Sequence, residues 1–570
     1  MQQSDLKNGT LPALLKRLRP NAEMLANSSH PSPSKTILFF SFTDTQRRAE
    51  VITSTGDDFD AAWSDGATRV CHAAELKNIT VRWLRVDWVV DVEALTWSEL
   101  RERLRKTKRN YFRHGLALDK EFRHSFLETE LNANAMLYPG GNTAHGIVNE
   151  NNFRRFARLK FNLQDVNLSD DNSVHIFSTK GVFASTDELG IHSITGENRH
   201  AGRRDLETLK PDDVLKLIND GSSYLATQVD KSGRFTYGWH PCFDRSIPGY
   251  NSLRHASTVY SMLEAWEVTQ EKKLLEAIDR AVGYLTETLI KTAQTPSGEA
   301  AFLVDTGSEV KLGGNAVSIL ALVKYTELLG TDRYCALLHK LAVGIVHMQD
   351  RDTGQFEHVL VYPSLATKEQ FRIIYYDGEA TFALMRLYAL TRDEIWLETV
   401  ERAFGYFIKA GHARAHDHWL SYSVNELTLY RPLETYYAFG IENFAGYLEF
   451  VLNRITTFPT LLELMMAARQ MVERLTDDPQ HRHLLEKVDL EKFYQALHAR
   501  AHYLLNGHFW PELAMFYEKP AKISGSFFIR HHSFRVRIDD VEHYLSGFVA
   551  YLKYLRTRQD NATDPSNQLQ

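Results

Sequence analysis

The sequence predicts a multi-domain protein in which an N-terminal α+β domain precedes an all-α domain, an (α/α)6 toroid. The main observation is a repeat: Ala281-Val282-Gly283, Ala342-Val343-Gly344 and Ala403-Phe404-Gly405 are each separated by 61 residues. This period fits a pair of antiparallel helices with a connecting loop. The helical region, roughly residues 203–558, has the length that six such hairpins need. An open solenoid is the alternative, but no repeat has the polar outer face of a cap.

The first 200 residues divide into an arm and an α+β domain. Residues 1–35 are polar and rich in Asn, Ser and Pro, so we expect a flexible arm with one short helix near residues 11–18. Residues 36–200 mix alternating, β-rich runs with helical periodicity. Thr96 and Glu99 have the spacing of a capping box. We expect strands at 36–43, 49–55, 79–90 and 174–183, extended chain at 109–118, and helices at 57–76, from 96, and at 122–131.

Only helical patterns continue after about residue 202. Pro211 suits the first turn of a helix. The repeats after about residue 412 follow from helical periodicity and the remaining length alone, and residues 559–570 form a polar tail. We expect helices at 211–229, 253–268, 272–289, 316–329, 332–348, 380–390, 394–408 and 540–555.

Composition narrows the class of protein. A net charge of −6 gives no electrostatic reason to expect nucleic acid as a partner. The three cysteines form no CxxC motif or cluster, which suits a reducing compartment and gives no structural zinc site. The N-terminus lacks the apolar core of a signal peptide, and no apolar run is long enough to span a membrane. We therefore expect a cytoplasmic protein without membrane contact, cofactor or metal.

Polar and aromatic residues gather just before or at the start of several predicted inner helices. In the 61-residue alignment, Arg254, Asn315 and Tyr376 fall at equivalent positions. If the ring closes, these clusters converge at one end of it, which is the usual layout of a small-molecule site. The candidate substrate-binding residues are Trp239, Tyr250, Asn251, Arg254, Asn315, Tyr376, His532 and Arg535.

Acid–base chemistry requires groups with separated proton affinities. The candidate catalytic residues at these helix starts are Asp377, Glu379, Asp539, Asp540 and His255. Structural roles are the alternatives. Each aspartate suits a helix N-cap, and Glu379 suits a first helical turn. Arg254 with His255 could equally hold adjacent repeats together through an ion pair.

By its repeat length and its polar inner-helix starts, the helical region resembles the six-hairpin glycosidase-like superfamily. The resemblance covers about 350 residues and implies a carbohydrate ligand in the mouth of the toroid. In hydrolases of that superfamily, acidic residues do the acid–base work, which implies such a role for Asp377, Glu379, Asp539 and Asp540. In the N-acylglucosamine 2-epimerase group histidines do it, and His255 and His532 are the positions to consider. The sequence assigns no family to the N-terminal domain.

The resulting hypothesis is a glycoside hydrolase-like, carbohydrate-active enzyme that uses carboxylates on a glycosidic or uronide substrate. In it, Arg254 binds an anionic sugar substituent, while Trp239, Tyr250 and Tyr376 stack on sugar rings. One alternative is a sugar epimerase or isomerase in which His255 and His532 are acid and base. The other is a non-catalytic toroid that binds a glycan or a protein. The α+β domain shapes one rim of the site or recruits a protein partner.

Overall fold

The computed structural model describes residues 10–28, 35–196 and 200–563, and the chain forms two compact units. The sheet unit comprises Met1–Glu207, Trp239–Ser246 and Asn506–Val536. The ring unit comprises Thr208–Gly238, Ile247–Leu505 and Arg537–Gln570. Each unit is therefore assembled from three separate stretches of chain.

The sheet unit is built on one antiparallel sheet in the order β2-β1-β3-β6-β4-β5, with β7 paired to β6. Its strands are β1 (Thr36–Thr43), β2 (Glu50–Gly56), β3 (Trp83–Thr96), β4 (Gly115–Ala117), β5 (Ser125–Phe126), β6 (Ser173–Ser185) and β7 (Ile191–Ile194). Its helices are α2 (Leu11–Ser28), α3 (Phe59–Leu76), α4 (Trp97–Lys106), α5 (Glu128–Ala133), α6 (Glu150–Phe161), α19 (Pro511–Ala514) and α20 (Pro520–Ile523).

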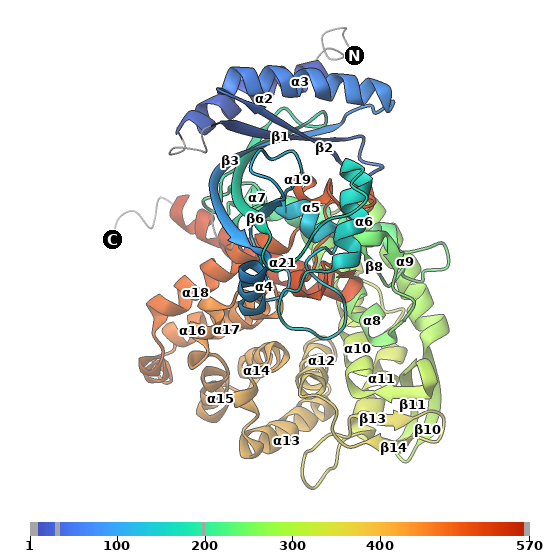
Figure 1. The fold of residues 1–570 in the computed structure, drawn as a ribbon. Coiled ribbons are helices and arrows are strands. Elements are labelled where there is room, and N and C mark those ends of the chain that lie inside the picture. The colour runs from blue at the N-terminus through green and yellow to red at the C-terminus, as the bar shows by residue number, and fades with distance from the viewer. Residues whose placement is uncertain (1–9, 29–34, 197–199, 564–570) are drawn as a thin grey trace, which may run out of the picture. The chain divides into compact units, whose positions relative to one another are not determined.

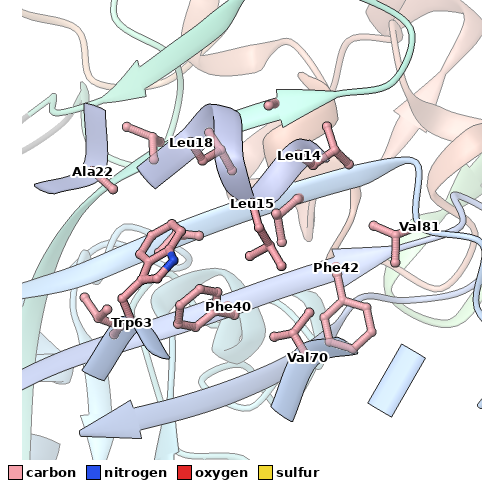
Figure 2. Packing of buried hydrophobic residues seen from close by; sticks show 14 of the residues in the cluster. Leu14, Leu15, Leu18, Ala22, Phe40, Phe42, Trp63, Val70 and Val81 are labelled. Atoms are coloured by element: carbon pink, nitrogen blue, oxygen red, sulfur yellow. The ribbon is translucent and has the colours of Figure 1, made fainter. Parts of the chain in front are cut away.

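Alternation along β1 explains how this sheet is covered. Successive side chains of a strand point to opposite faces, and Phe40 and Phe42 join a buried cluster with Leu14 and Leu18 of α2 and Trp63 of α3 (Figure 2). Helix α2 is thus part of the core and continues ten residues beyond the short helix expected. Residues 1–9 and 29–34 of the expected arm lie outside the described residues. A second cluster, centred on Trp97, Phe126 and Phe153, joins α4 and α6 to β4 and β5.

Most predicted elements of the sheet unit are present. The capping box at the start of α4 is confirmed, because Thr96 accepts the Glu99 N–H and the Glu99 carboxylate accepts the Thr96 N–H. The helix predicted at 122–131 is wrong in its first half. Phe122 has a φ of 59°, and Asp119 accepts the N–H groups of Arg123 and His124. This turn leads into β5, so the helix there begins only at Glu128.

The ring unit is a closed circle of helical hairpins (Figure 1). The inner helices are α8 (Ser252–Thr269), α10 (Leu312–Leu329), α12 (Tyr375–Thr391), α14 (His418–Tyr430), α17 (Thr460–Thr476) and α21 (Ile538–Thr563). Each contacts the next, and α21 contacts α8. The outer helices are α7 (Pro211–Gln228), α9 (Lys272–Tyr284), α11 (Cys335–His347), α13 (Glu394–Ala410), α15 (Glu434–Ala445) and α18 (Leu490–Tyr503), with α16 (Leu448–Asn453) in addition. The predicted (α/α)6 toroid is confirmed, and the open solenoid is excluded.

Short strands that were not predicted connect outer to inner helices. They form one sheet in the order β10-β11-β12-β13-β14. Their bounds are β10 (Ile290–Thr295), β11 (Gly298–Asp305), β12 (Glu309–Lys311), β13 (Val359–Val361) and β14 (Ala366–Glu369). Among the residues that the structure describes, no helix is long and apolar enough to cross a membrane.

Candidate active site

The first turns of the inner helices lie at one end of the ring unit. In a circle of antiparallel hairpins all inner helices run in the same direction, so their N-termini share an end. Side chains of these first turns contact one another across neighbouring helices, as the bonds below show. The polar residues gathered there are the partly exposed Arg254 and His543 and the buried Asp377, Glu379, Asp417, His418, Glu463, Asp539, Asp540 and Glu542.

Arg254 of α8 faces acids of α21, the helix that closes the ring. Its Nε lies 3.5 Å from Asp539 Oδ2, and its Nη1 lies 3.8 Å from Glu542 Oε1. Arg537 adds a second cation, at 2.9 Å from Asp539 and 3.0 Å from Asp540. The charge of Arg254 is therefore already balanced within the protein, and both predicted aspartates are ion-paired.

Glu379 of α12 has a buried carboxyl group, one oxygen of which is not hydrogen-bonded. It is 2% exposed, and its Oε2 has no hydrogen-bond partner among the described residues. Gly313 leaves room for it, since a Cβ on that glycine would lie 1.8 Å from Oε2. Burial raises the pKa of Glu379 to about 8, with Asp417 adding to the rise and Arg254 opposing it. At neutral pH the protonated acid therefore predominates.

Asp417 is the N-cap of α14, and one of its carboxyl oxygens is not hydrogen-bonded. Its Oδ1 accepts the Leu420 N–H at 3.0 Å, and Asn443 binds both its N–H and its C=O. These bonds fix the residue at the N-terminus of a helix, where negative charge is favourable. Its Oδ2 is buried without a hydrogen-bond partner among the described residues and lies 3.2 Å from His418 Nδ1.

Two histidines face each other beside these acids. The rings of His418 and His543 are 5.4 Å apart and nearly perpendicular. His543 Nδ1 lies 2.9 Å from Glu463 Oε2, so each histidine has a carboxylate partner. Burial, and then the charge of Arg254, lowers the pKa of His543 to about 4. Burial raises the pKa of Glu463 to about 7, and His418 opposes that rise.

His418, Glu463 and His543 are also the described residues best placed to hold a metal. Their ligand atoms lie within 4.8 Å of one another. However, the positive charge of Arg254 acts on both Glu463 and His543, which disfavours a cation there. The arrangement fits proton transfer better than metal binding.

The other predicted residues of the ring unit have structural contacts. Asn251 caps α8 through the Arg254 N–H, and Tyr376 packs its ring near His358. His255 is fully buried, with its ring nitrogens bonded to Tyr250 Oη and the Ala281 carbonyl.

Asn315 links an inner helix to the following outer helix, as His255 does in the preceding hairpin. His255 and Asn315 each bond the carbonyl of a residue 26 positions later, in the outer helix that follows. Asp377 lies on another side of α12 from the acids, 3.3 Å from His358 Nε2 and 3.4 Å from His412 Nε2.

Three predicted residues belong to the sheet unit instead of the ring unit. Trp239 lies under the Lys522 ammonium, which is 3.0 Å from its ring centroid. Arg535 and His532 contact each other, with Arg535 Nη2 3.1 Å from His532 Nδ1. The histidine pair expected for an epimerase, His255 with His532, is therefore divided between the two units.

A pocket opens beside the buried acids of the ring unit. Its empty space is about 630 Å³, including the part open to solvent. Asp417 and His418 line it together with the half-exposed ring of Tyr375. Polar atoms without a hydrogen-bond partner beside an aromatic ring suit the binding of a polyhydroxylated ligand.

Asp417, His418, Glu463, Glu542 and His543 were not among the candidate site residues, although the polar segment His416-Asp417-His418-Trp419 resembles the other clusters. The sequence also contains a signal for the other three. Glu463 is a lone acid in the apolar run Leu461-Leu462-Glu463-Leu464, and Glu542 with His543 follows the predicted aspartates by one turn. A charged residue in an apolar inner helix needs a partner across the ring.

The chain matches no family model and no curated protein. Solved structures with a similar fold include a D-mannose isomerase, with 11% identity, a TM-score of 0.46, and coverage of 62% of this chain and 100% of that one. A cellobiose 2-epimerase from Bacillus thermoamylovorans has 12% identity, a TM-score of 0.44 and coverages of 60% and 99%. An unsaturated glucuronyl hydrolase from Streptococcus agalactiae has 14% identity, a TM-score of 0.43 and coverages of 61% and 94%. Similarity this remote transfers no reaction.

Proposed function

We propose that the ring unit is a carbohydrate-active enzyme that cleaves a glycosidic or uronide bond by carboxylate acid–base chemistry. One observation carries the proposal. Glu379 and Asp417 are buried neighbours, and each has a carboxyl oxygen without a hydrogen bond to any described residue. Burial raises the pKa of Glu379, whereas Asp417 accepts a backbone N–H at the start of α14. A protonated acid beside a carboxylate can act with it as acid and base on one substrate.

The roles follow from these surroundings. Glu379, whose pKa is raised by burial, keeps its proton at neutral pH and can deliver it to a leaving oxygen. Asp417, stabilised by the Leu420 N–H and the start of α14, supplies the carboxylate that activates water or attacks the sugar. Tyr375 supplies an aromatic face in the adjoining pocket.

A second candidate is a sugar epimerase or isomerase. The specific observation in its favour is that His418 and His543 face each other, each with a carboxylate partner. Burial lowers the pKa of His543 to about 4, so its neutral ring could accept a proton from a sugar carbon at neutral pH.

Turnover of a substrate panel tests the proposal. Purified protein is incubated with oligosaccharides, uronides and free reducing sugars, and bond cleavage is measured beside exchange of carbon-bound hydrogen with D₂O. We expect cleavage, and a fall in kcat of about 10²–10⁴-fold in Glu379→Gln because the proton donor is lost. Glu442→Gln, which changes a 56%-exposed side chain of the same unit, is the matched control.

Hydrogen exchange without bond cleavage would overturn the hydrolase proposal. If His543→Asn abolished that exchange while Glu379→Gln retained it, the activity would belong to the epimerase class. Activity of both variants at the wild-type level would exclude both mechanisms.

A further inference from the structure

The pocket beside Asp417 contains a stack of flat groups on one side. His416 and Tyr447 stack with ring centroids 4.2 Å apart, and Tyr447 and Phe450 stack at 4.3 Å. The Arg454 guanidinium continues the stack, 4.9 Å from the Phe450 ring centroid. All four side chains line the pocket.

Arg454 is held in place, yet its charge is not balanced. Its Nε donates to Thr456 Oγ1 at 2.6 Å, so stacking and this bond together fix the guanidinium plane. No carboxylate of the described residues lies within ion-pair distance of Arg454, whereas Arg254 faces both Asp539 and Glu542. A fixed guanidinium is suited to the bidentate binding of a carboxylate or phosphate.

The electrostatics near Arg454 favour an anion at this end of the pocket. Thr460 and Leu461 line the same pocket and form the first turn of α17, whose N-terminal N–H groups add positive potential. Asp417 and the unbonded Nε2 of His418 line it as well. The pocket thus combines a cationic end with groups that bind hydroxyls.

We propose that this pocket binds a sugar carrying an anionic substituent, a carboxylate or a phosphate, and that Arg454 determines this specificity. The inference rests on the proposed function for the presence of a sugar. It also moves the anion site predicted at Arg254 to Arg454, because Arg254 is neutralised within the protein.

Equilibrium binding tests the inference without turnover. Calorimetry compares D-glucuronate, its neutral methyl ester, D-glucose 6-phosphate and D-glucose, each with the wild type. We expect at least one of the two anions to bind about tenfold or more tightly than D-glucose, and a preference for glucuronate to be absent for its ester. The ester comparison needs no mutation, so it stands even if a variant fails to fold. Which anion is preferred identifies the substituent.

Variants then assign the preference to one residue. Arg454→Gln should lose the preference, Arg454→Lys should keep part of it as a point charge, and Arg414→Gln, at an 84%-exposed arginine of the same unit, should keep all of it. Equal binding of anions and neutral sugars, or a preference that survives in Arg454→Gln, overturns the inference. Loss of turnover in Glu379→Gln with the preference for the anion retained would concern the proposed reaction and would leave this inference intact.

Discussion

At the scale of single residues, Glu379 shows that the position of a side chain, and not its residue type alone, determines its protonation state at neutral pH. The same side chain on the surface would be ionised at neutral pH. Here burial withdraws it from water, and the opposing charge of Arg254 is too small an effect to restore ionisation, so the pKa rises from 4.5 to about 8. The carboxyl keeps its proton because its charged form is expensive to bury.

This burial makes stability depend on pH. Because the folded-state pKa of Glu379 lies above the unfolded value, the folded protein binds the proton more tightly, and its free energy of unfolding falls as pH rises from about 4.5 to about 8. Glu379→Gln cannot ionise and should lose less stability over that interval. We expect the variant to match the wild type near pH 5 and to exceed it by a few kcal/mol near pH 9, at ~1.4 kcal/mol per pKa unit.

Urea denaturation at pH 5, 7 and 9 measures the difference. Other buried acids, such as Glu463, also contribute to the wild-type profile, but they are common to both proteins. Parallel profiles for the two proteins would contradict the assigned proton on Glu379.

The sequence predicts residues at helix starts better than it predicts which way they face. Glu379 and Arg254 were predicted for the site and lie among the buried acids. Asp377 is only two residues from Glu379, but on a helix that separation is a rotation of about 200°. It therefore contacts His358 and His412 instead. Facing direction depends on the exact helix start and on its neighbours, neither of which the repeat fixes.

At the scale of elements, the repeated glycine in the outer helices has different roles in different copies. In α11, a Cβ on Gly344 would lie 2.7 Å from both the Ala301 carbonyl oxygen and Asn315 Nδ2. Around Gly283 in α9 and Gly405 in α13, no heavy atom lies within 4 Å of such a Cβ. The close approach of β11 to α11 therefore explains why a glycine is needed at Gly344, but not at Gly283 or Gly405.

Substitution by alanine should therefore have opposite effects. Gly344→Ala should lower the free energy of unfolding by about 1–3 kcal/mol, because strand and helix must separate. Gly283→Ala and Gly405→Ala should raise it by about 0.5–1 kcal/mol, because alanine is the better helix former. Thermal and urea denaturation measure both effects, and destabilisation by all three substitutions would refute the distinction.

Elements defined by local pattern were predictable, and elements defined by distant pairing were not. The helices contain long runs of helical periodicity, which identify them from the local sequence. By contrast, β12 and β13 pair across the whole of α10 and α11, and each has three residues. So short a strand carries no local signal, since its stability comes from its partner.

At the scale of the whole molecule, the chain returns to the sheet unit after α18. The returning segment 506–536 is anchored by Glu512, which is fully buried and bonded to Arg204 through both carboxylate oxygens. Arg85 donates to the Glu512 backbone carbonyl at 2.8 Å. Burial alone would raise the pKa of Glu512, but Arg204 outweighs it and the pKa falls to about 2. Sequence periodicity could not reveal this return, because the partners are 308 residues apart.

Glu512→Gln should destabilise the protein by about 3–5 kcal/mol, because Arg204 then loses its buried counter-charge and keeps only the partly exposed Glu188, 3.9 Å away. The loss should be largest at neutral pH and smaller below pH 4, since the wild-type ion pair weakens as pH falls through the lowered pKa. Denaturation monitored by circular dichroism measures it. Glu102→Gln, at a surface pair with Arg105, should leave the midpoint unchanged, and an equal effect of both changes would argue against the anchor.

Closure of the ring also has a consequence for biosynthesis. Ser257 and its bonding partner Glu542 are 285 residues apart. The two ion pairs of Arg254 on the first inner helix are likewise made with Asp539 and Glu542 of the last. A nascent polypeptide on the ribosome has no closed ring of inner helices until α21 has left the exit tunnel. Messages that end prematurely would yield products in which Arg254 is without its counter-ions, a defect suited to recognition by protein quality control.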